Sequence, residues 1–123
     1  MLMANSKNAN TKSKLEALQL VFYEQLPERM IAIEHLWQAC CGESFDKRDI
    51  SELHRLSHSL AGLAGSFGAA EISKSAHELD VVLGSIIDSE EQSISDEQKQ
   101  YIDELTVMLK LVVKQWKPAD FFV

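Results

Sequence analysis

The side chain best placed for chemistry in this chain is His58, which stands on the polar side of an amphipathic helix. At about 100° per residue, a helix over roughly residues 49–66 gathers its apolar side chains on one face, which must be buried. These side chains are Leu53, Leu56, Leu60, Leu63, Ala64 and Phe67. His58 points the opposite way. Its imidazole is therefore predicted to lie in water, where a neutral ring nitrogen is a competent nucleophile.

The surface around His58 is predicted to carry almost no side chain. Gly62 lies one turn after His58, Gly65 lies two turns after it, Ala61 flanks it, and His54 lies one turn before it. A glycine inside a helix costs about 1 kcal/mol relative to alanine, and both glycines project away from the leucines. Because this bare surface suggests that a partner must come close to the imidazole, we assign these four neighbours of His58 to partner contact.

His54 and His58 also allow an alternative interpretation, as ligands of a metal ion. They are four residues apart, a spacing that lets two imidazoles hold one metal, with a carboxylate added from a neighbouring helix. However, the sequence has no H-E-x-x-H pattern, and His35 and His77 each stand alone on other segments. We therefore predict no bound metal, and keep metal binding by His54 and His58 as the weaker alternative.

The composition predicts one acidic domain. A chain of 123 residues with 46% hydrophobic side chains can form one core and is too short for two. Its formal net charge of −7 opposes binding to nucleic acid or to an anionic membrane. No segment approaches the roughly 18 consecutive apolar residues of a membrane span, and the first residues lack the apolar segment of a secretory signal. We therefore expect a cytoplasmic protein.

The spacing of apolar residues is helical along the chain. Residues 1–12 lack this spacing and are predicted to form an unstructured leader. One helix is predicted from about Ser13 to Pro27, where the missing amide hydrogen should stop it, and a second over about 27–41. The second ends in two adjacent cysteines, Cys40 and Cys41, which we interpret as small half-buried residues rather than a redox switch.

Three more helices complete the predicted fold. The helix with His58 is capped by Asp49, and a break at 66–68 leads to a helix over about 69–87, with Asp80 at the margin of its apolar face. Ser95 and Gln98 have the spacing of a capping box, which begins a last helix that ends near Trp116. We predict an all-α fold over residues 13–123, an antiparallel up-and-down four-helix bundle with an extra N-terminal helix.

One segment resembles the signature of histidine-containing phosphotransfer (HPt) domains, H-x-L-K-G followed by a further glycine. The segment runs from His58 to Gly68 and reads HSLAGLAGSFG, so that His58, Leu60, Gly62 and Gly68 fall in register. Residues 69–80, which read AAEISKSAHELD, also resemble the next helix of the family. The resemblance is close over roughly residues 53–83, and the number of helices and the length of the chain agree over about 13–117.

This resemblance implies a phosphorelay intermediate in two-component signalling. His58 would take a phosphoryl group from the aspartate of one receiver domain and pass it to another. The implied partners are response-regulator receiver domains and a hybrid sensor kinase, and we expect this chain to act as a monomer. Magnesium would come from the receiver partner, so we expect no cofactor here. Since the sequence has neither a P-loop nor kinase-like glycine boxes, we predict a phosphocarrier rather than an enzyme that uses ATP.

The chain departs from the family signature at Ala61, where the family usually has a lysine that is thought to lie near the phosphoryl group. Arg55, about 60° from His58 on the helical wheel, either replaces this lysine or is an ordinary solvated charge. Asp80 is our candidate for the acceptor that orients the imidazole; otherwise it is a boundary carboxylate. The missing lysine also leaves open a receiver- or kinase-binding scaffold or inhibitor that keeps the HPt fold without transferring phosphate.

Overall fold

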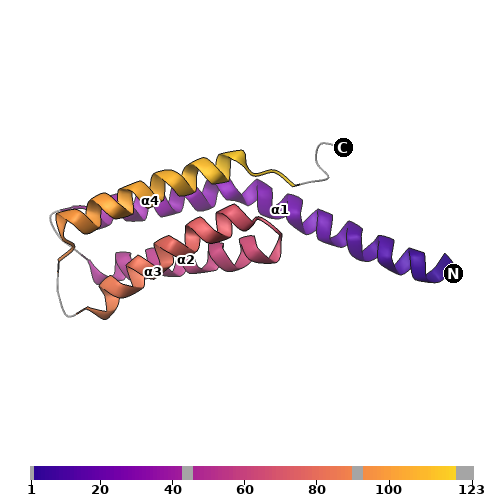
Figure 1. Cartoon of the computed structure of the whole chain (residues 1–123), viewed down its shortest axis with the longest axis horizontal. Helices are drawn as coiled ribbons and strands as arrows, with labels where there is room; N and C mark the ends of the chain where they lie inside the picture. Colours follow the sequence, from indigo (N-terminus) through magenta and orange to yellow (C-terminus); the bar gives the residue numbers. More distant parts are fainter. Residues whose placement is uncertain (1, 43–45, 90–92, 119–123) are drawn as a thin grey trace.

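The computed structural model describes residues 2–42, 46–89 and 93–118, with side chains from Ser13 onward, and these residues form four helices. They are α1 (Leu2–Cys40), α2 (Lys47–Ser66), α3 (Ala70–Asp88) and α4 (Asp96–Gln115). The second half of α1 lies along α2 and α4, while its first half extends past the end of the bundle (Figure 1). No strand occurs among the described residues, and the all-α prediction is confirmed.

The two helices predicted on either side of Pro27 are a single helix, so the extra N-terminal helix is wrong as a separate element. Pro27 is exposed inside α1. A proline inside a helix costs about 3 kcal/mol, and burial on both sides of it outweighs this cost. Phe22 and Leu26 before Pro27 and Met30 and Ile33 after it are all buried on one face of α1, and burying each of these side chains stabilises the fold by about 1.5–3 kcal/mol.

The start of the chain also differs from the prediction. The backbone is helical from Leu2, whereas residues 1–12 were expected to form an unstructured leader. Neither glycine nor proline occurs before Pro27. A helix that tertiary packing holds further along can therefore extend outward, because each added residue costs far less than starting a new helix.

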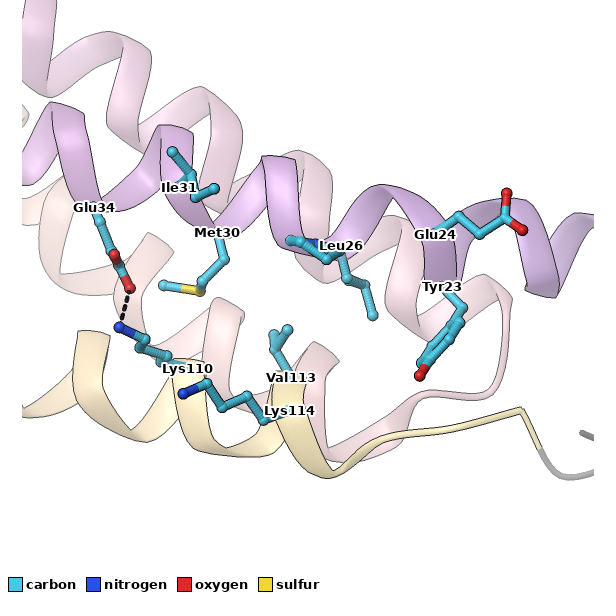
Figure 2. Close-up of a pocket in the computed structure, with 10 residues that line it drawn as sticks. Tyr23, Glu24, Leu26, Met30, Ile31, Glu34, Lys110, Val113 and Lys114 are labelled. Atoms are coloured by element: carbon cyan, nitrogen blue, oxygen red, sulfur yellow. Dashed lines mark ion pairs between the residues drawn. The ribbon is translucent and has the colours of Figure 1, made fainter. Parts of the chain in front are cut away.

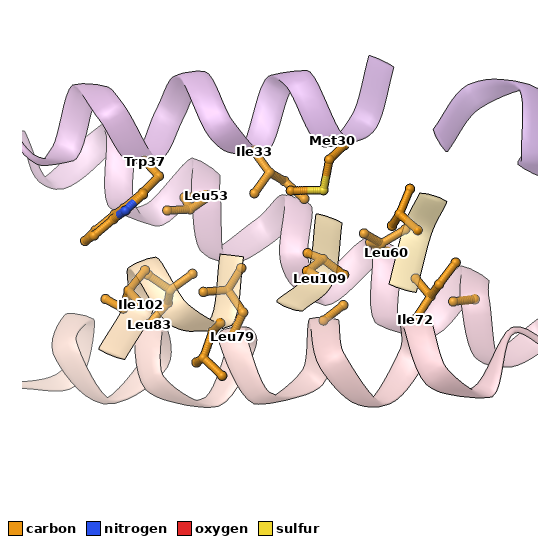
Figure 3. Packing of buried hydrophobic residues seen from close by; sticks show 14 of the residues in the cluster. Met30, Ile33, Trp37, Leu53, Leu60, Ile72, Leu79, Leu83, Ile102 and Leu109 are labelled. Atoms are coloured by element: carbon orange, nitrogen blue, oxygen red, sulfur yellow. The ribbon is translucent and has the colours of Figure 1, made fainter. Parts of the chain in front are cut away.

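The core lies where the apolar faces of all four helices meet (Figure 3). In α2 the buried residues include Leu53, Leu60 and Ala64, and Leu56, Leu63 and Phe67 are partly buried against them. This is the face predicted from the spacing. The predicted apolar face of α3 is likewise buried, namely Ile72, Ala76, Leu79, Leu83 and Ile86.

The ends of the helices determine how α2 and α3 are oriented. Asp46, and not Asp49 as predicted, caps α2 by accepting a hydrogen bond from the Arg48 amide at 2.8 Å. The turn to α3 passes through Gly68, whose φ of +78° lies in the left-handed region that favours glycine.

The predicted capping box of Ser95 and Gln98 is present at the start of α4. Within the described ranges, none of the helices is long and apolar enough to span a membrane.

Candidate functional site

His58 lies in the middle of α2 with its ring in solvent and one nitrogen held by α3. Its side chain is 75% exposed. The Nδ1 atom lies 3.0 Å from Oδ2 of Asp80 on α3. When the ring proton is assigned to Nδ1, this nitrogen donates a hydrogen bond to the carboxylate and the lone pair lies on Nε2. The structure thus brings together the predicted nucleophile and the predicted orienting group.

Asp80 is a buried carboxylate that faces three imidazoles. Its side chain is only 10% exposed. The Nε2 atom of His54 lies 2.7 Å from Oδ1, a close contact that is not aligned as a hydrogen bond, and the Nδ1 atom of His77 lies 3.9 Å from Oδ2. We call His54, His58, His77 and Asp80 the Asp80 cluster. A buried carboxylate is stable only with hydrogen-bonding or charged neighbours; His58 meets this need at Oδ2, and His54 lies against Oδ1.

Small residues let α2 and α3 approach each other at this cluster. A Cβ atom placed at Gly84 would lie 3.3 Å from His54 Nε2, and one at Gly65 would lie 3.3 Å from Ser73 Oγ. Gly65 therefore allows close packing between α2 and α3, and its contact with a partner stays a prediction. At Gly62 a Cβ would meet nothing within 4 Å. Gly62 thus leaves open the surface one turn after His58.

Arg55 is engaged on its own helix rather than with the Asp80 cluster. Its guanidinium makes two hydrogen bonds to the carboxylate of Glu52, the one from Nε at 3.0 Å. This interaction lowers the pKa of Glu52 and raises that of Arg55, in both cases chiefly through the side-chain hydrogen bond. Replacement of the family's lysine by Arg55 stays a prediction, and the guanidinium would have to leave Glu52 to perform it.

Three residues of this site were missed from the sequence. The sequence pattern leaves His77 alone on its segment, although it lies three residues before Asp80 and so on the same face of α3. Gly84 and Ser73 had no signal of their own, because their contacts are to α2. Ser73 Oγ donates a hydrogen bond to the carbonyl oxygen of Ala61 at 2.8 Å, which joins the two helices beside the position of the missing lysine.

His54 and His58, the pair that forms the alternative metal site, both face Asp80. The ring centroids of His54 and His58 are 6.4 Å apart, and both rings present a nitrogen to the carboxylate. Among the residues that the structure describes, no group of three or more His, Cys, Asp or Glu side chains is arranged to hold a metal ion.

A groove of about 420 Å³ lies on other helices, between α1 and α4 (Figure 2). Apolar side chains such as Met30, Ile31 and Val113 line it, and the ion pair of Lys110 with Glu34 crosses it at 3.2 Å. Since the Asp80 cluster is built from α2 and α3 alone, the groove contributes no residue to it.

Comparison with known families agrees with this arrangement. The family model of the Hpt domain matches residues 17–114, and the chain therefore belongs to the Hpt domain family. At the level of the family, such domains carry out phosphotransfer in two-component signalling, where they interact with receiver domains and kinases. The comparisons with curated proteins and with solved structures gave no match. The resemblance drawn from the residues after His58 is thereby confirmed.

Proposed function

We propose that this protein is a phosphocarrier in which His58 accepts a phosphoryl group from the aspartate of one receiver domain and passes it to another. The observation that carries the proposal is the 3.0 Å contact of His58 Nδ1 with Asp80 Oδ2, on an imidazole that is 75% exposed. With the proton on Nδ1, the nucleophilic lone pair lies on Nε2, on the side of the ring that a partner can reach.

The transfer needs few groups from this chain. The Nε2 lone pair attacks the phosphorus of an aspartyl phosphate, the N–P bond forms, and the P–O bond breaks as the aspartate carboxylate leaves. The ring then carries positive charge, and Asp80 stabilises it through the Nδ1–H hydrogen bond. In the second half of the relay an acceptor carboxylate attacks the same phosphorus and the N–P bond breaks. Because the transition state is loose, the main requirement is in-line positioning.

The surface beside His58 suits a docking receiver domain. Gly62 is open, and on α3 Val81, one turn after His77, is 58% exposed and apolar. Transient interfaces of this kind are modest in area, so a small apolar contact beside the imidazole is sufficient. In this proposal the receiver supplies the aspartate and magnesium, a hybrid sensor kinase supplies the phosphate, and this chain acts as a cytoplasmic monomer without a cofactor or ATP site.

A second candidate function is a receiver- or kinase-binding protein that does not transfer phosphate. The observation that favours it is Ala61, because the cation expected three residues after the histidine is absent. The two candidates differ in one property: only the phosphocarrier forms a phosphohistidine at His58.

The test is to incubate the full chain with a panel of phosphorylated receiver domains and to follow the radiolabel. We expect a label that is labile in acid and stable in alkali, as for a phosphohistidine, and that is lost in His58→Gln. His35→Gln is the matched control, because His35 is exposed on α1 and lies outside the Asp80 cluster. Label that persists in His58→Gln would remove His58 from the role, and binding of receivers without any label would favour the second candidate.

A further inference from the structure

We infer that His77 is the cation that holds the phosphoryl group on His58, in place of the lysine that this chain lacks at residue 61. The inference rests on the proposed function, because it concerns the phosphorylated state of His58. It assigns a phosphoryl-binding role to a residue that the resemblance did not point to.

The need for a cation follows from the charges at the site. A phosphoryl group on His58 Nε2 would bring a charge of about −1.5 to −2 to a ring whose other nitrogen already faces the carboxylate of Asp80. Such a group is stabilised by a nearby positively charged hydrogen-bond donor. Arg55 is engaged with Glu52. Within the described residues, the basic side chains at ion-pair distance from Asp80 are all histidines.

The contacts between α2 and α3 place His77 opposite the required position. Ser73, one turn before His77, contacts the carbonyl of Ala61 at 2.8 Å, and Asp80, three residues after His77, contacts His58 at 3.0 Å. His77 therefore lies across from the segment of α2 between His58 and Ala61. The small side chain of Ala61 leaves this segment clear for a phosphoryl group.

His77 is also free to act, whereas His54 is not. The side chain of His77 is 67% exposed, and its 3.9 Å distance to Asp80 Oδ2 is too long for a hydrogen bond. Its ring can therefore turn toward a phosphoryl oxygen at little cost. His54 is only 36% exposed, lies 2.7 Å from Asp80 Oδ1 and is backed by Gly84. His54 is thus a positioning residue for Asp80.

An imidazole in this role makes phosphoryl binding depend on pH, which a lysine would not do near neutrality. Histidine is the side chain whose charge can change between about pH 5 and 8, whereas a lysine keeps its charge well above neutral pH. Among the described residues, Asp80 lies 3.9 Å from His77, Lys74 lies one turn before it on α3, Glu78 follows it directly, and His54 and His58 meet Asp80 from α2. The contact should be fully present when His77 is protonated and should disappear as the pH rises and His77 loses its proton.

The experiment phosphorylates the full chain with phosphoramidate, which needs no partner protein, and follows the phosphoryl group on His58 by ³¹P NMR as a function of pH. A protonated His77 should lower the titration midpoint of the phosphoryl group by about half a unit or more, the size expected for unit charges several ångströms apart at a protein surface. By reciprocity, loss of the phosphoryl proton should raise the midpoint of the His77 ring resonances by the same amount.

Two variants of His77 and one control complete the design. In His77→Gln the phosphoryl midpoint should rise by about half a unit relative to the unmodified chain. In His77→Lys it should stay low and should no longer follow the protonation of residue 77. His35→Gln should behave as the unmodified chain. A phosphoryl midpoint that is the same in His77→Gln as in the unmodified chain, with unmoved His77 resonances, would overturn the inference alone. Absence of phosphate on His58 would overturn the proposed function and the inference with it.

Discussion

The carboxylate of Asp80 provides the sharpest test of how His58 is oriented. The substitution Asp80→Asn keeps the shape of the side chain and an oxygen that can accept the Nδ1–H hydrogen bond, but it removes the negative charge. A hydrogen bond to a charged group contributes about 1.5–3 kcal/mol, compared with about 0.5–1.5 kcal/mol for a neutral pair. The loss of about 1–1.5 kcal/mol of stabilisation for the ring that becomes positive on phosphorylation corresponds to roughly tenfold in rate.

Because His58 Nδ1 lies 3.0 Å from Asp80 Oδ2 and the carboxylate is 10% exposed, little water screens this interaction on the side of Asp80. Asp80→Ala also removes the acceptor that selects the Nδ1–H tautomer, so its effect on the rate should be larger than that of Asp80→Asn. Neither variant should unfold the chain, because the three histidines left without the carboxylate are partly or largely exposed and stay hydrated.

The assay is rapid-quench measurement of phosphoryl transfer from a labelled receiver domain to this chain, with circular dichroism to verify the fold. Asp103→Asn is the matched control: it makes the same chemical change on α4, where the carboxylate accepts a hydrogen bond from Trp37 at 2.6 Å and faces no histidine of the Asp80 cluster. Transfer by Asp80→Asn and Asp80→Ala at the rate of the unmodified chain would refute the orienting role, and so would an equal loss in Asp103→Asn.

Three further predictions concern the glycines and the cysteines. Gly62→Gln places a long side chain where a Cβ meets nothing within 4 Å, so the thermal unfolding midpoint should stay within a few degrees while transfer from a receiver falls at least tenfold; undiminished transfer would show that receivers do not approach over Gly62. Gly84→Ala gains about 1 kcal/mol of helix propensity but brings a Cβ to 3.3 Å from His54 Nε2, so transfer should slow several-fold without loss of stability. The equally helical Gly62→Ala should gain the same stability and leave the His54 ring resonances unmoved, and identical NMR spectra around His54 in the two variants would contradict this account. Burial raises the pKa of the Cys40 thiol to about 11, whereas Cys41 is exposed. At pH 8 a colorimetric thiol reagent should therefore react with one thiol in the folded chain and with two in denaturant. Rapid reaction of both thiols in the folded chain would refute this prediction.

Local sequence was sufficient for the features that depend on a single helix. The spacing of leucines in α2 identified its buried face and placed His58 opposite to it, since exposure follows directly from the helical period. The capping box at Ser95 was likewise readable, because all its atoms come from four consecutive residues. The pair of Arg55 with Glu52 is equally local, because oppositely charged residues three positions apart on a helix are neighbours.

The features that join two helices could be seen only in the tertiary structure. Periodicity identifies which face of a helix is buried, but it does not show which residue of a neighbouring helix will lie against it. The packing of α2 on α3 therefore decided that one carboxylate meets three imidazoles, that Gly65 and Gly84 allow the close approach, and that His77 lies across from Ala61. The course of α1 at Pro27 was also decided by tertiary packing. The proline destabilises the helix locally, but burial of apolar residues on both sides of it in the bundle makes α1 continue.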